Sequence, residues 1–132
     1  MNNGQKDTPR MALGRAGEDA VCEFLSRRGH SIIERNCRVG HLEIDIISLD
    51  KVGVHFVEVK TRMAPFTARP EENVDRTKQR RIVKAAMRYL ATSRDGRLGK
   101  DLEILFDVAA VVFDGGEVRI DWFPQAYCPM YF

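Results

Sequence analysis

The spacing of apolar residues predicts two helices. Between Arg10 and Arg28, apolar residues recur at intervals of three and four, which is the period of a helix with one buried face, and Gly29 is a suitable stop. A second helix is predicted from Val74 to about Thr92. The apolar positions of the first helix are Leu13, Ala16, Ala20 and Phe24, and those of the second are Ile82, Val83, Ala86, Met87 and Leu90.

Shorter apolar runs bounded by turn residues predict five strands. They cover residues 31–39, 42–49, 54–61, 102–113 and 118–123. The order α-β-β-β-α-β-β predicts an α/β fold with a mixed central sheet flanked by helices. Residues 1–9 are expected to form a disordered tail and residues 10–132 a single domain, with a long loop at 63–73 that contains two prolines.

Composition places the chain among ordinary globular proteins. Of its 132 residues, 44% are hydrophobic and 30% are charged, as is typical of soluble domains. No apolar run approaches the roughly 20 residues of a membrane span, and the polar N-terminus lacks a signal peptide, so we expect a cytoplasmic protein with no membrane partner. Three cysteines without a C-x-x-C pair, and three histidines without ligand spacing, predict neither a disulfide framework nor a zinc site.

The strongest candidate for chemistry lies on the two strands joined by Asp50-Lys51-Val52-Gly53. If they form a symmetric hairpin, Asp45 comes opposite Glu58, and Glu43, Glu58 and Lys60 share one face with it. Carboxylates this close raise each other's pKa unless a cation lies between them. Mg²⁺ or Mn²⁺ held by such carboxylates would activate water towards a phosphodiester, and Lys60 would orient the water or stabilise the developing charge.

Glu18 is a further candidate, on the first predicted helix. It lies three residues before Val21 and seven before Leu25, which puts its carboxylate beside the buried face. We expect it to approach the other carboxylates from above the sheet, where it would bind the metal or one of its waters.

The motifs and their order resemble the YraN-like family, a group of small bacterial proteins usually described as predicted endonucleases. Asp45, followed after 12 residues by Glu58-Val59-Lys60, resembles the PD-(D/E)xK signature of restriction-endonuclease-like nucleases. The surrounding segments also match in order: "GRAGEDAVCEFL", "ERNCR", "LEIDIISLD", "FVEVKTR" and "NVDRTKQRRIVKAAMRYL". The outline is similar to that of archaeal Holliday-junction resolvases as well.

This resemblance implies a restriction-endonuclease-like fold and a metal-dependent nuclease acting on DNA, including branched or repair-related DNA. It implies Glu18, Asp45, Glu58 and Lys60 as catalytic residues, with metal ligands from Asp45, Glu58 and the backbone carbonyl of Val59. A homodimer would suit a branched substrate, because cutting a junction requires two active sites. Two positions depart from the family pattern: Leu42 replaces a usual glycine, and Leu105 a frequent arginine.

Non-catalytic interpretations of the same residues are also open. Glu58 and Lys60 would also make a simple ion pair on a surface strand, and a nuclease fold can bind nucleic acid or dock a partner without cutting. The acidic cluster could instead form salt bridges to its own helices in a structural protein. Phosphate contacts are expected from Arg15, Arg38, Arg62 and Lys78. The basic stripe formed by Arg81, Lys84 and Arg88 is expected to be a solvated helix face.

Overall fold

The fold was analysed in a computed structural model, which describes residues 8–65 and 76–127. The first helix, α1 (Pro9–Arg27), begins where the Thr8 hydroxyl accepts a hydrogen bond from the Met11 N–H at 3.1 Å, with Pro9 in the first turn. It ends at Arg28, and Gly29 adopts a φ of +90°, a conformation that glycine accommodates without strain.

Five strands form one sheet in the order β1-β2-β3-β4-β5. They are β1 (Ser31–Val39), β2 (Leu42–Leu49), β3 (Gly53–Met63), β4 (Glu103–Asp114) and β5 (Glu117–Phe123). Neighbouring strands are antiparallel except β3 and β4, which are parallel because α2 (Arg76–Thr92) lies between them in the chain. This is the mixed, helix-flanked sheet predicted for a restriction-endonuclease-like fold.

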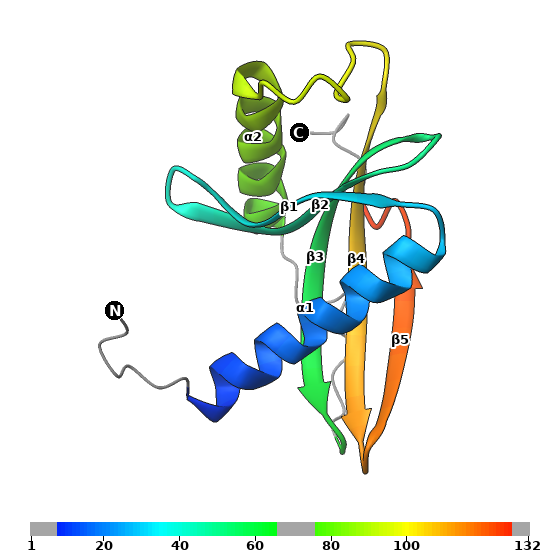
Figure 1. The fold of residues 1–132 in the computed structure, drawn as a ribbon. Helices are drawn as coiled ribbons and strands as arrows, with labels where there is room; N and C mark the ends of the chain where they lie inside the picture. The colour runs from blue at the N-terminus through cyan, green and yellow to red at the C-terminus, as the bar shows by residue number, and fades with distance from the viewer. Residues whose placement is uncertain (1–7, 66–75, 128–132) are drawn as a thin grey trace, which may run out of the picture.

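The two helices cover opposite faces of the sheet. On one face, Val21 and Leu25 of α1 pack against Val57 and neighbouring residues of β4. On the other, Ile82 and Tyr89 of α2 pack in a cluster with Phe56, Phe106 and residues of β2. In Figure 1, α1 crosses β3, β4 and β5, whereas α2 stands beside the β1–β2 hairpin. Side chains on β3 therefore alternate between an α1 side and an α2 side.

The buried helix faces differ in detail from the predicted ones. In α1 the fully buried stripe is Gly17, Val21 and Leu25, while Ala16 is exposed, because the helix closes on β3 through the small Gly17. In α2, Met87 is 40% exposed and Tyr89 takes the buried position, where its ring packs edge-on against Phe56. Each shift rotates the buried face by about one residue, or roughly 100°, around the helix axis.

Some predictions lie outside the described residues. These are most of the N-terminal tail (residues 1–7), most of the proline-containing loop and the first positions of the second helix (66–75), and the last five residues, which include Cys128. Cys22 and Cys37 are both free thiols. Among the helices of residues 8–65 and 76–127, neither is long and apolar enough to cross a bilayer.

Candidate functional site

The β2–β3 hairpin pairs in the predicted register. Ile46 lies opposite Val57 and Ser48 opposite His55, and the Asp50 N–H donates to the Gly53 carbonyl at 3.1 Å. Ladder pairing reaches its end at Ile46 and Val57, so the next positions along the same register are Asp45 and Glu58. Figure 1 shows the β1–β2 hairpin turning across and away from β3, which opens the sheet at this point.

Asp45 lies in this opening and its side chain replaces the lost strand pairing. Its Oδ2 accepts a hydrogen bond from the Val59 N–H at 2.8 Å. Burial above all, and then the nearby Glu58 and Glu18 carboxylates, raise the pKa of Asp45 to about 7, against the lowering effects of the Val59 N–H and Lys78. Burial and the neighbouring carboxylates disfavour the ionised form of Asp45, and a cation bound there would stabilise that form.

Glu58 is held by two lysines. Its Oε1 lies 3.3 Å from Lys60 Nζ and 2.6 Å from Lys78 Nζ, and the side chains of Glu58 and Lys60 are only 13% and 14% exposed. Burial alone would lower the pKa of Lys78, but its hydrogen bond and charge interaction with Glu58 outweigh that effect and raise it. Lys78, expected from the sequence to contact phosphate, is thus also a partner of Glu58.

Glu18 approaches Asp45 from the other side of the sheet. Glu58 and Lys60 alternate with Val57 and Val59, which pack towards α1, so the charged pair points to the α2 side. Glu18 comes from α1, on the opposite side. Asp45, Glu58, Lys60 and Lys78 thus lie together. Glu18 is near enough for its negative charge to raise the pKa of Asp45.

The Glu18 carboxylate itself is poorly compensated. Its Oε1 is buried without a hydrogen-bond partner among the described residues, and Arg35 Nη2 lies 3.8 Å away. Burial raises the pKa of Glu18, against the lowering effects of Asn36 and Arg35. Glu43, predicted to share a face with Asp45, is exposed. Two partly buried carboxylates with raised pKa values, Glu18 and Asp45, therefore flank the opening in the sheet.

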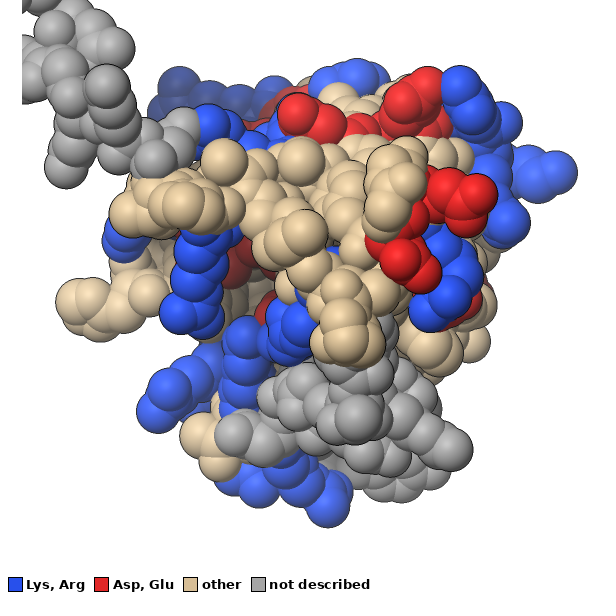
Figure 2. Space-filling model, turned by 90° about the horizontal axis from the view of Figure 1, so that it is seen from below, with Lys and Arg blue, Asp and Glu red and all other residues tan. Residues whose placement is uncertain are grey.

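The other residues predicted to contact phosphate lie on one helix and two strands. Arg15 is exposed on α1, and Arg38 is exposed on β1 opposite Glu43. Arg62 lies two residues beyond Lys60 on β3, hence on the same side, and its Nη1 donates to the Thr61 carbonyl at 2.8 Å. Figure 2 looks at the end of the molecule where β3 and β4 finish, and shows a hollow with acidic atoms recessed among Lys and Arg side chains.

The basic stripe of α2 is exposed, as predicted, and it also lines a groove. The groove encloses about 560 Å³ between the β1–β2 turn and α2. Its lining residues are Val39, His41, Leu42, Arg81, Lys84, Ala85 and Arg88. Leu42, where the family pattern has glycine, packs here against the core cluster beneath α2 at the first position of β2, without breaking that strand.

The second departure from the family pattern falls in the core. Leu105 is only 5% exposed on β4, so this position faces the interior and not a phosphate. Two residues on, Asp107 is 1% exposed and forms a 2.6 Å hydrogen bond with His55.

A group of residues that sequence spacing did not reveal lies at the turn end of the same hairpin. His30, Asp50 and His55 have ligand atoms within 4.8 Å of one another. They are the one such trio of His, Cys, Asp or Glu in the parts of the chain that the structure describes. Because they come from a loop, a turn and a strand, no short motif joins them, and only the correct β2–β3 register places Asp50 beside His55.

Comparison with known proteins gives a consistent family assignment. A family model described as "Uncharacterised protein family UPF0102" matches residues 17–111. A UPF0102 protein of Bacteroides thetaiotaomicron is 38% identical over 120 residues, covering 91% of this chain and 95% of the relative. One from Syntrophotalea carbinolica is 42% identical over 118 residues, covering 89% and 93%.

Among solved structures, SfsA of Pyrococcus furiosus in complex with Ca²⁺ is a distant match. It has 16% sequence identity and a TM-score of 0.37, with coverage of 86% of this chain and 63% of that one.

Proposed function

The chain belongs to the uncharacterised protein family UPF0102, and we propose that it is a metal-dependent nuclease that hydrolyses phosphodiester bonds in DNA. One observation carries the proposal. Asp45 and Glu58 occupy the next register positions beyond the point where β2 leaves β3, with Lys60 beside them, and the pKa of Asp45 is raised to about 7.

The residues present fit Mg²⁺ or Mn²⁺. The donors are carboxylate oxygens of Asp45 and Glu58, with the Val59 carbonyl as the further ligand that the family resemblance implies. Mg²⁺ prefers such oxygen donors and commonly binds through one or two carboxylates while keeping several waters. The Val59 N–H occupies Oδ2 of Asp45 and leaves its other oxygen available. A divalent cation would also stabilise the ionised Asp45 carboxylate, which burial and the nearby carboxylates disfavour.

Each side chain then has a defined role. When bound, the cation supplies an activated water and polarises the phosphodiester. Asp45 and Glu58 hold it. Lys60 Nζ, 3.3 Å from Glu58, is positioned to orient the attacking water and to stabilise negative charge on the phosphate. Glu18 shares the negative environment of Asp45 and is proposed to hold a metal-bound water.

The surrounding cations support a polyanionic substrate. Arg15, Arg38, Arg62 and Lys78 are proposed to contact phosphates near the site, and the groove lined by Arg81, Lys84 and Arg88 provides a basic path along α2. Branched or repair-related DNA, a cytoplasmic location and a homodimer remain parts of the proposal that rest on the family resemblance.

The test is a cleavage panel. Purified protein with Mn²⁺ or Mg²⁺ is incubated with linear, nicked, flapped and four-way DNA and with single-stranded RNA. The proposal expects cleavage that needs the metal and is lost in Lys60→Ala. Equal cleavage by wild type and Lys60→Ala would mean that the activity comes from elsewhere.

One observation favours a second candidate, a non-catalytic nucleic-acid-binding or partner-docking module. Lys60 and Lys78 already neutralise Glu58 without a metal. This candidate predicts that Mn²⁺ leaves the melting temperature unchanged and that DNA binds equally well with and without metal. The nuclease proposal predicts a rise in melting temperature with Mn²⁺ that Asp45→Ala abolishes.

A further inference from the structure

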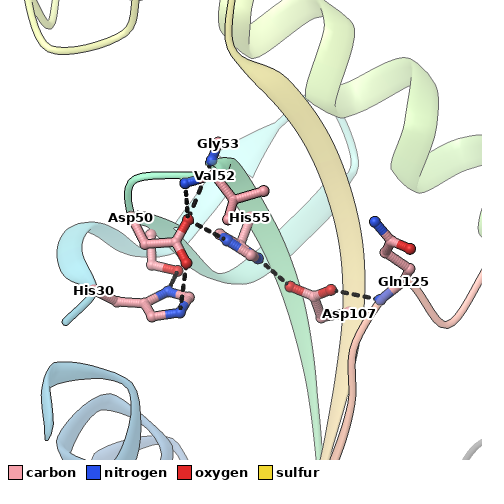
Figure 3. Close-up of polar contacts among 8 residues, drawn as sticks. His30, Asp50, Val52, Gly53, His55, Asp107 and Gln125 are labelled. Carbon is pink, nitrogen blue, oxygen red and sulfur yellow. Dashed lines mark hydrogen bonds and ion pairs between the residues drawn. The ribbon is translucent and has the colours of Figure 1, made fainter. Parts of the chain in front are cut away.

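The turn end of the β2–β3 hairpin carries a second cluster of potential ligands, separate from the carboxylates discussed above. Figure 3 shows His30, Asp50 and His55 pointing towards one another, from the loop after α1, the β2–β3 turn and β3 respectively. Asp50 is five residues from Asp45 along the hairpin strand, which corresponds to about 16 Å. His55 points to the α1 side of β3, opposite to Glu58.

Both imidazole rings are oriented through the nitrogen that faces away from Asp50. His55 Nδ1 lies 2.6 Å from Asp107 Oδ2, and His30 Nδ1 lies 2.9 Å from Ser48 Oγ. Asp107 and Ser48 are almost completely buried, and Asp107 is fixed in turn because its Oδ1 accepts the Gln125 N–H at 2.8 Å. In metal sites, a histidine ligand usually donates its second N–H to such a carboxylate or oxygen partner, which fixes the tautomer.

The remaining nitrogens converge on one carboxylate. His55 Nε2 is 2.9 Å from Asp50 Oδ1, and His30 Nε2 is 3.4 Å from Asp50 Oδ2. In a tetrahedral zinc site with bonds of about 2.0–2.1 Å, neighbouring ligand atoms lie about 3.3 Å apart. The two separations that involve Asp50 are therefore close to those that zinc would impose, and all three ligand atoms lie within 4.8 Å of one another.

Asp50 is held in place by its own turn. Its Oδ1 accepts the N–H groups of Val52 and Gly53 at 3.0 and 3.1 Å, as Figure 3 shows. Its side chain is 19% exposed, whereas those of His30 and His55 are 7% and 8% exposed. Solvent therefore reaches the cluster from the Asp50 side, where a water can complete the coordination.

We propose that His30 Nε2, His55 Nε2 and the Asp50 carboxylate bind one zinc-like transition-metal ion, with water as the fourth ligand. Two imidazoles and one carboxylate suit Zn²⁺ or Co²⁺ and differ from the all-oxygen donors around Asp45. The ion would tie the loop after α1 to the β2–β3 turn and, through Asp107, to the segment after β5. This inference does not depend on the nuclease proposal.

The chain offers an internal control, because His41 is its third histidine and lies exposed in the β1–β2 turn. The full chain, treated with a chelator, is titrated with Co²⁺ while the ring resonances of the three histidines are followed by NMR. His30 and His55 should broaden or shift at one equivalent, with His41 unaffected, and visible absorption of four-coordinate Co²⁺ should appear. Unchanged His30 and His55 resonances, or equal broadening of His41, would overturn the proposal in the wild-type protein itself.

Variants separate this site from the carboxylates. Zn²⁺ should raise the melting temperature of wild type, Asp45→Asn and His41→Gln alike, but not of His30→Gln. Asp107→Asn should weaken Co²⁺ binding about 10- to 100-fold without removing a ligand, because Asp107 acts by positioning His55. A Zn²⁺-dependent rise that persists in His30→Gln, or an affinity unchanged in Asp107→Asn, would contradict the assignment.

Discussion

Replacing Asp45 with asparagine should stabilise the metal-free protein. Asparagine has nearly the same shape, and its carbonyl oxygen can still accept the Val59 N–H. What it removes is a carboxylate whose ionised form is disfavoured in the folded protein by burial and by Glu58 and Glu18. The substitution should therefore raise the free energy of unfolding, because residues of a functional metal site are often unfavourable for stability.

The magnitude follows from the pKa of Asp45. Raising it from 3.8 to about 7 corresponds to about 4 kcal/mol at full ionisation, because each tenfold change in a protonation equilibrium is about 1.4 kcal/mol. Since Asp45 is only partly shielded from solvent, we expect Asp45→Asn to gain about 2 to 4 kcal/mol in free energy of unfolding at about pH 8.5.

The pH dependence has a definite sign. A carboxyl whose folded pKa is raised binds more protons in the folded than in the unfolded state, so the contribution of Asp45 to wild-type stability falls as pH rises from 3.8 to about 7 and then levels off. The advantage of Asp45→Asn should therefore be small near pH 4, grow through this window and stay constant above it.

The assay is urea denaturation of both proteins, in chelator, at about pH 5 and about pH 8.5. The gain from Asp45→Asn should be about 1 to 2.5 kcal/mol larger at the higher pH. Glu43→Gln, an exposed carboxylate two residues away on β2, is the matched control and should change stability little. An Asp45→Asn protein that is destabilised, or whose gain does not vary with pH, would refute the reasoning about this site.

Two further predictions concern packing and substrate. A Cβ at Gly17 would come 2.9 Å from Thr61 Cβ, so Gly17→Ala should lower the free energy of unfolding by about 1–3 kcal/mol. A Cβ at Gly14 would meet no neighbour, so Gly14→Ala should raise it by about 0.5–1 kcal/mol. Urea denaturation measures both changes. Equal effects would contradict the tight contact between α1 and β3. Arg81→Ala should weaken DNA binding and reduce its salt slope by about 1, while Arg97→Ala, paired with Asp95 at 2.7 Å, should do neither.

The order of helices and strands along the chain and the β2–β3 register could be derived from the sequence for local reasons. The four-residue connection at 50–53 fixes which residues of β2 and β3 face each other, and this alone put Asp45 opposite Glu58. Gly29 after α1 and Gly115 and Gly116 in the β4–β5 turn adopt positive φ angles, so they also marked boundaries correctly.

Long-range placement could not be derived in the same way. The ion pair between Lys78 and Glu58 depends on how the start of α2 meets β3, and the two residues are 20 positions apart in the chain. The side from which Glu18 approaches depends on which face of the sheet α1 covers. Alternation along a strand shows which residues share a face, but it does not tell which helix packs there.

The central claim is that Asp45, Glu58 and Lys60 form a metal-dependent phosphodiester-cleaving site. The most direct test measures single-turnover DNA cleavage in Mn²⁺ by wild type, Asp45→Asn and the matched control Glu43→Gln, purified in parallel. The account predicts cleavage by wild type and Glu43→Gln at similar rates, and a loss of at least about 100-fold in Asp45→Asn. Cleavage by Asp45→Asn at the wild-type rate, or none by any of the three proteins while DNA still binds, would contradict it.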